Sequence, residues 1–160
     1  MRMSQGVEWA VHTLLALSCL EDDQPVPTAT LAAGHDLPRS YLNKQLQRLV
    51  KAGLLTSEPG AQGGFRLARP PASITMLDVV EAIEGDARLF RCTEIRQCGT
   101  IGRHGGGDFS VPCAVTNSMR KAEEAWREAL AGQTLAAVLA EANEHAPAMA
   151  RAIRQVFGRE

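Results

Sequence analysis

The 160-residue sequence predicts a mainly α-helical fold with one small β-hairpin. Apolar residues recur at helical spacing in several segments, and two short strand-like runs flank a glycine-rich loop. Near the C-terminus, residues 114–130 carry a 4-3-4-3 apolar seam. A chain of this length, with 45% hydrophobic and 22% charged residues, fits one globular domain, or one domain with an appended dimerisation element.

The first part of the chain has the pattern of a helix-turn-helix followed by a hairpin. We expect helices over residues 7–20, 28–35 and 39–52, with the tight link DLP before the third. Leucines form the inner stripe of that third helix, and Gly53 ends it. The runs LLTSE and FRLARP, joined by PGAQGG, then predict a β-hairpin wing. Residues 1–85 therefore read as a winged helix-turn-helix domain.

The rest of the chain divides into a loop and a second helical part. Thr75 and Asp78 predict a capping box for the helix that ends at Gly85. Residues 86–113 form a cysteine-rich loop with little helix or strand pattern, and residues 114–160 a long dimerisation helix with a helical tail. In the tail, we expect one helix after Thr134 and another at Pro147. The apolar seam of the long helix predicts a homodimer.

Basic residues concentrate in residues 37–69, a segment with six basic residues and one acidic residue. The whole chain, by contrast, has a net charge of -1. A local basic segment favours a polyanionic partner. The outer face of the third helix carries side chains that read base edges or bind phosphates. The candidates for DNA contact are Arg39, Ser40, Tyr41, Asn43, Lys44, Gln45 and Arg48 on this helix, and Gln62 and Arg66 in the wing. For a lone helix, the alternative is a solvated basic face.

Three of the four cysteines lie between residues 92 and 113, in a loop with five glycines. Cys92, Cys98 and Cys113 do not have the close pairs of a structural zinc site, whereas iron-sulfur clusters tolerate irregular spacing. Cys113 also stands at the start of a predicted helix, where the macrodipole favours a thiolate. The spacing indicates a metal-binding or thiol-reactive loop and leaves those two alternatives open.

Glu8 and His12 are one turn apart on the first helix. Such a pair can ligate iron or zinc, but the same spacing also makes an ordinary helix-surface hydrogen bond. Trp9, beside Glu8, is placed to sense changes there. Cys19 reads as a buried apolar residue.

The sequence shows no signal-peptide pattern and no apolar run of membrane-span length. We therefore expect a cytoplasmic protein without a membrane partner. A small metalloenzyme using Glu8 and His12 would need acid-base groups around a substrate, and no such constellation is present. The sequence thus favours a regulator over an enzyme.

The segments VEWAVHTLLAL, SYLNKQLQRLVKAGLL, GAQGGFRLARP, ITMLDVVEAIEG, CTEIRQC and PCAVTNSMRKAEEAWREAL, in this order, resemble the Rrf2 family of winged-helix regulators, which includes the IscR, NsrR and RsrR repressors. The resemblance covers about residues 1–140. It implies a homodimer with crossed long helices that binds palindromic promoter DNA and often carries an iron-sulfur cluster.

The similarity is greatest to the RsrR-like branch, through VEWA at residues 7–10, His12 and CTEIRQ at residues 92–97. That branch implies a 2Fe-2S cluster held by Cys92 and Cys113 of one subunit and by Glu8 and His12 of the other. The additional Cys98 departs from this pattern. Two alternatives to the 2Fe-2S regulator therefore stay open: a 4Fe-4S nitric-oxide sensor with three cysteine ligands, or a cluster-free thiol-disulfide switch. We expect a redox-responsive repressor, and in the cluster-based mechanism Trp9 is the candidate for relaying the signal.

Overall fold

The computed structural model describes residues 3–20, 22, 24–60, 63–85, 88–107 and 109–157. The chain forms two compact units, which are described separately below. The larger, here called the winged-helix unit, combines residues 2–86 with residues 130–160. The smaller, the cysteine unit, contains residues 87–129.

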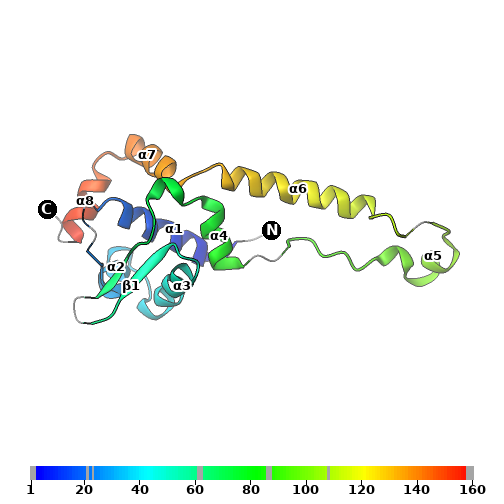
Figure 1. Ribbon diagram of the computed structural model, residues 1–160, viewed down its shortest axis with the longest axis horizontal. Helices are drawn as coiled ribbons and strands as arrows, with labels where there is room; N and C mark the ends of the chain where they lie inside the picture. The colour runs from blue at the N-terminus through cyan, green and yellow to red at the C-terminus, as the bar shows by residue number, and fades with distance from the viewer. Residues whose placement is uncertain are drawn as a thin grey trace. The chain divides into compact units, whose positions relative to one another are not determined.

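The winged-helix unit begins with three helices and a hairpin, as predicted (Figure 1). The helices are α1 (Gln5–Ser18), α2 (Thr28–Gly34) and α3 (Arg39–Lys51), and strands β1 (Leu55–Glu58) and β2 (Gly64–Leu67) pair antiparallel. Between α2 and α3, Asp36 has a φ of 50°, in the left-handed region that Asp tolerates better than most residues. This left-handed residue allows the close turn of the helix-turn-helix.

The wing is tied to the segment that precedes α2. Val26 and Phe65 exchange two backbone hydrogen bonds, each 2.9 Å long. At Gly64 the backbones approach so closely that a Cβ would lie 2.2 Å from the Val26 carbonyl oxygen. Only glycine fits this position, which explains the glycine before Phe65 and fixes the hairpin against the helices.

Helix α4 (Met76–Glu84) has the predicted capping box. Asp78 N–H donates to Thr75 Oγ1 and Thr75 N–H donates to Asp78 Oδ2, at 3.1 and 2.8 Å. Gly85 ends the helix with a φ of 86°, which requires glycine.

Residues 130–160 belong to the winged-helix unit. The predicted boundary at residue 114 stays a prediction. Helix α7 (Leu135–His145) starts where Leu135 N–H donates to Ile74 O and Met76 N–H donates to Gln133 O, both at 2.8 Å. Leu135 itself is fully buried. Helix α8 (Met149–Val156) starts two residues later than Pro147, because the Pro147–Ala148 pair forms a turn.

One apolar core joins α1, α2, α3, α4 and α7. It contains Leu14 of α1, Leu31 of α2, Leu42, Leu46 and Leu49 of α3, Val79 of α4 and Leu135 of α7, all without exposed surface. The leucine stripe of α3 is thus confirmed as the inner face. Burial of each such side chain stabilises the fold by roughly 1.5–3 kcal/mol.

The cysteine unit has more regular structure than the sequence suggested. A 3-10 turn, η2 (Ile95–Gln97), and a short helix, α5 (Gly99–His104), interrupt the loop, so the expectation of little helix there is wrong. Gly99, with a φ of 63°, allows α5 to begin directly after Cys98. The long helix α6 (Ala114–Ala131) is confirmed, and its seam residues Val115 and Met119 are 60% and 43% exposed.

The start of α1 is fastened to the end of α4 by one carboxylate. Ser4 donates its N–H and its Oγ–H to Glu84 Oε1, at 2.8 and 2.7 Å. These hydrogen bonds lower the pKa of Glu84, the hydroxyl contributing more than the N–H, and Arg48 adds a smaller effect. The ionised carboxylate is therefore favoured in the folded state.

Replacing Glu84 by Gln should lower the free energy of unfolding at neutral pH by no more than about 1 kcal/mol, because Glu84 is exposed and screened by solvent. Since the pKa is lower in the folded state, the wild-type advantage is present above the unfolded pKa. It disappears as the pH falls through the folded value. Urea unfolding of both proteins at pH 7 and near pH 3 measures this, and an equal difference at both pH values would contradict it.

Candidate functional site

The outer face of α3 is available for contact with a macromolecule. Arg39, Ser40, Asn43, Lys44 and Arg48 are exposed, and Tyr41 is 40% exposed. The fold presents these side chains on the second helix of a helix-turn-helix, the helix that enters the major groove in such proteins. These six residues lie on the exposed face of α3, and their contact with DNA stays a prediction.

Gln45 was wrongly placed on this outer face. Its side chain is only 3% exposed and packs against Gly6 of α1, where a Cβ would lie 3.1 Å from Gln45 Cδ. Its Oε1 accepts a 3.3 Å hydrogen bond from Arg48 Nη1. The long stem of Gln45 fills the α1–α3 contact, so its role is structural.

Arg48 has a second structural partner. Its Nη1 also donates to the Ile83 carbonyl oxygen of α4, at 3.0 Å. One nitrogen of this guanidinium thus joins α3 to α4, beside the Ser4–Glu84 contact. Substitution of Arg48 would disturb the packing of α3, which makes Lys44 the cleaner position for testing DNA contact.

In the wing, Gln62 lies outside the described residues. Arg66 is half-buried and forms an ion pair with Glu58 of β1, with Nη2 3.1 Å from Oε1. A phosphate would have to compete with that carboxylate for the guanidinium.

Helix α1 is packed directly on α3 through an aromatic contact. The rings of Trp9 and Tyr41 meet edge to face, with centroids 4.9 Å apart and an interplanar angle of 79°. Aromatic pairs of this geometry contribute about 0.5–1.5 kcal/mol beyond their buried area. Trp9 thus connects α1 to an exposed residue of the second helix of the helix-turn-helix.

Glu8 and His12 are both exposed and line the same hollow on α1, of about 830 Å³. Glu84 and the residues around Ser4 form its other wall. The centroid of the His12 ring also lies 6.2 Å from that of His35, the C-cap residue of α2. Burial, and to a smaller extent the charge of His12, lower the pKa of His35, which favours a neutral imidazole.

The cysteine unit brings Cys92 and Cys113 into the electrostatic reach of one arginine. Arg96 is bound to Glu94, which raises the pKa of Arg96, and the Cys113 and Cys92 thiols raise it further. Glu94 has a left-handed φ of 54°, and its N–H donates to Cys92 Sγ at 3.4 Å. Arg96 Nη2 donates to the Val111 carbonyl oxygen at 3.1 Å, next to Pro112 and Cys113.

Cys113 has a stabilised thiolate. Backbone N–H groups of Thr116 and Val115, in the first turn of α6, hold the pKa of the Cys113 thiol below its ordinary value, with Arg96 adding to the effect. This agrees with the expectation for a cysteine at a helix N-terminus. Cys98 instead stands as the N-cap of α5, and its thiol takes no part in the contacts of Arg96 that are described above.

Cys92, Cys113, Glu8 and His12 supply two sulfurs, a carboxylate and an imidazole, a donor set that suits an iron-sulfur centre. The cysteines belong to one compact unit and the α1 pair to the other. Within the described part of a single chain, no three His, Cys, Asp or Glu side chains gather at one point.

Sequence reasoning missed Glu84, His35 and the Glu94–Arg96 pair. Glu94 and Arg96 are two residues apart, a spacing that does not pair side chains in a regular helix. The left-handed Glu94 brings them together, and its φ cannot be read from the residue type. In the sequence, only the closeness of Glu94 and Arg96 to Cys92 could have indicated this pair.

The geometry defines a winged helix-turn-helix DNA-binding protein. The family model Rrf2, described as an iron-dependent transcriptional regulator, matches residues 3–141, and the chain belongs to this family. It is a DNA-binding transcriptional regulator and not an enzyme. No described helix is both long and apolar enough to cross a bilayer.

Relatives of known structure or name cover most of the chain. NsrR of Geobacillus kaustophilus is 29% identical over 140 residues, covering 87% of this chain and 90% of NsrR. The structure of T. potens IscR has a TM-score of 0.66 at 26% identity, covering 91% of both chains. CymR, the global cysteine regulator of B. subtilis, has the same fold, with a TM-score of 0.68 at 21% identity over 88% of this chain and 98% of CymR.

Proposed function

We propose that the protein is a homodimeric repressor that binds palindromic promoter DNA and responds to redox or nitrosative signals through an iron-sulfur cluster. The packing of α1 on α3 carries this proposal, because the helix with Glu8 and His12 touches the DNA-facing helix at Trp9–Tyr41. The iron-dependent description of the family supports the choice of metal.

We assign the ligands of a 2Fe-2S cluster to Cys92 and Cys113 of one subunit and to Glu8 and His12 of the other. Backbone N–H groups at Cys113 favour its thiolate, and Arg96 lies close enough to both cysteines to offset negative charge on a bound cluster. Such a cluster supplies reversible one-electron chemistry, and imidazole ligation raises its reduction potential.

The residues around Glu8 link α1 to α3, so they can transmit a change at the cluster to the DNA-facing helix. Gly6 packs on Gln45 and Trp9 on Tyr41, so a small displacement of α1 moves the residues that orient α3. Operator half-sites one helical turn apart tolerate little change in the spacing of two recognition helices. A differential stability of a few kcal/mol between two arrangements would switch occupancy.

Iron and sulfide analysis of anaerobically purified protein, with absorption and electron paramagnetic resonance spectra, tests the cofactor. We expect two irons per subunit and a reducible cluster, as the 2Fe-2S assignment requires. DNA affinity in both redox states is then measured on a duplex selected from a random-sequence pool. Four irons per subunit would favour the 4Fe-4S alternative with Cys98 as a ligand.

A thiol-disulfide switch is the second candidate, favoured by the lowered pKa of Cys113 in a loop that also exposes Cys92 and Cys98. It requires iron-free protein whose DNA affinity still changes with oxidant. Mass spectrometry of the oxidised protein would then show a disulfide that includes Cys113.

Replacing Trp9 by Ala should leave the iron content unchanged and reduce the ratio of DNA affinities between the two redox states. The lost Tyr41 contact is worth about 0.5–1.5 kcal/mol, which corresponds to a reduction of roughly 2- to 12-fold. Iron analysis and fluorescence anisotropy on the selected duplex measure both quantities. Trp9→Phe keeps an aromatic ring and is the control; an unchanged ratio in Trp9→Ala would remove Trp9 from the relay.

A further inference from the structure

A second cavity lies in the winged-helix unit, between α1, the end of α2, α7 and α8. Its volume is about 520 Å³, within the range of about 300–1,000 Å³ typical of small-molecule sites. No residue of the cysteine unit lines it. We call it the tail cavity.

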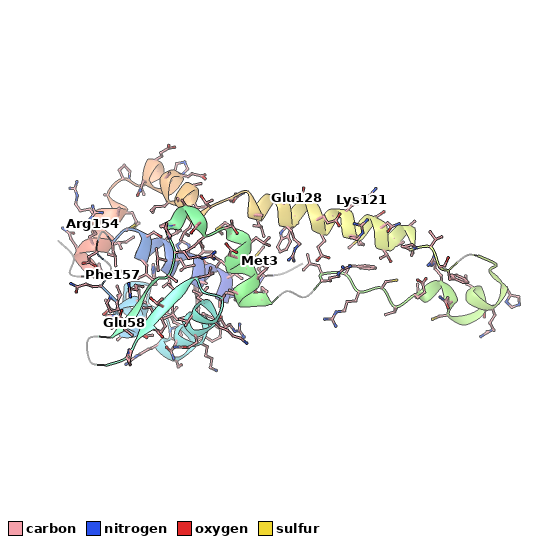
Figure 2. All side chains as sticks on the ribbon, in the orientation of Figure 1. Met3, Glu58, Lys121, Glu128, Arg154 and Phe157 are labelled. Atoms are coloured by element: carbon pink, nitrogen blue, oxygen red, sulfur yellow. The ribbon has the colours of Figure 1, made fainter. Side chains whose placement is uncertain are left out.

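Most of the wall is apolar. Leu15 and Ala16 of α1 face Leu139 of α7 and Ile153 of α8. Two contacts hold α8 in place: Phe157 lies against Gly34, where a Cβ would be 3.1 Å from its Cε1, and Arg154 Nη1 donates to Cys19 O at 3.4 Å. Figure 2 labels Arg154 and Phe157 at this helix. The wall formed by α8 is therefore fixed to the end of α2 and to the end of α1.

The cavity has few polar side chains. Among the described lining residues there is no Asp, Glu, Lys or Arg, and the polar side chains are histidines, Asn143 and Cys19. A charged ligand would be desolvated there without a counter-ion, which is costly. The lining thus selects a neutral molecule.

His35 provides the specific group. Its Nε2 is buried and has no hydrogen-bond partner among the described residues. An unsatisfied buried polar atom costs about 1–3 kcal/mol, so a ligand that supplies the missing partner gains that amount in addition to its apolar contacts. A hydroxyl group can satisfy either tautomer, because it both donates and accepts.

From these features we propose that the tail cavity binds a small, neutral, mainly apolar molecule with one hydroxyl group, such as a phenol, which hydrogen-bonds to His35. The site adjoins the α1 hollow, since His12 lines both, and it includes Gly34 and His35 at the end of α2. A bound ligand would contact α1 and the helix-turn-helix at once. The proposal does not depend on the cluster, so it can fail or hold separately from the proposed function.

The test compares 2-naphthol with naphthalene, which lacks the hydroxyl, by equilibrium titration of the full-length protein at pH 7 with and without iron. We expect 2-naphthol to bind at least about 5-fold more tightly, as a hydrogen bond of about 1 kcal/mol or more implies. His35→Phe should abolish this preference, whereas His104→Phe, in α5 outside the cavity, should retain it. Ala150→Phe should weaken both compounds by filling the space.

Equal binding of the two compounds to the wild-type protein would overturn the proposal without any variant. So would a preference for 2-naphthol that survives in a folded His35→Phe protein. If neither compound binds and Ala150→Arg dissociates an oligomer, the cavity is an interface between copies of the chain, and the ligand site is refuted.

Discussion

Cys113→Ala and Cys92→Ala should each reduce the iron content of the purified protein to near zero, whereas Cys98→Ala should retain two irons per subunit. The reason is the arrangement of the cysteine unit. Cys92 and Cys113 both act on Arg96, and each accepts hydrogen bonds from backbone N–H groups. Cys98 stands at the N-cap position of α5 without a side-chain capping hydrogen bond, and it is not among the groups that act on Arg96. Loss of one ligand of four leaves an iron atom with an incomplete shell.

Iron and sulfide assays on anaerobically purified variants measure this outcome. Cys19→Ala is the matched control, because Cys19, the C-cap residue of α1, is a buried free thiol whose pKa is raised by burial. It should keep the wild-type iron content. If Cys98→Ala also lost its iron, the three-cysteine 4Fe-4S arrangement would replace the assignment to Cys92 and Cys113.

Lys44→Ala should weaken DNA binding about 10-fold at physiological salt, and Arg39→Ala/Lys44→Ala about 100-fold, by removing phosphate contacts from the exposed face of α3. The slope of log affinity against log salt should fall by about one for each phosphate contact removed. Among the described residues, neither Arg39 nor Lys44 has a contact comparable to the Arg48–Ile83 hydrogen bond, so the effect should appear without loss of stability.

Fluorescence anisotropy at several salt concentrations, on the selected duplex and on a random one, measures both quantities. Lys121→Ala is the matched control, an exposed lysine of α6 (Figure 2). It should leave affinity and slope unchanged. A double variant with wild-type salt dependence would show that α3 does not contact the phosphates.

Local sequence patterns were sufficient for most of the helices and for the hairpin. The capping box of Thr75 and Asp78, the stop at Gly85, the leucine stripe of α3 and the start of α6 all depend on residues within about one turn of each other. The glycine of the wing was also readable, although its reason, the closeness of the Val26 backbone, was not. The family followed from the resemblance of six sequence segments, in their order, to Rrf2 regulators.

Contacts between distant residues were not readable in this way. Gln45 is polar and borders the leucine stripe, so only the glycine at position 6, which leaves room for its side chain, explains why it is buried. Arg48 likewise lies on the face of α3 that the sequence pattern assigns to solvent, yet its guanidinium donates a hydrogen bond to the Ile83 carbonyl oxygen of α4. Helical periodicity reports which residues share a face, but not what lies opposite that face.

The amino-acid sequence alone was enough to predict the winged helix-turn-helix, the exposed basic helix and the three-cysteine loop. Each of these features depends on local periodicity, capping or composition. Tertiary packing added the convergence of Cys92 and Cys113 on Arg96, the docking of α7 and α8, and the cavity at His35. These features join residues far apart in the chain, or depend on a single left-handed residue such as Glu94. Their free energies come from long-range contacts, which no local pattern encodes.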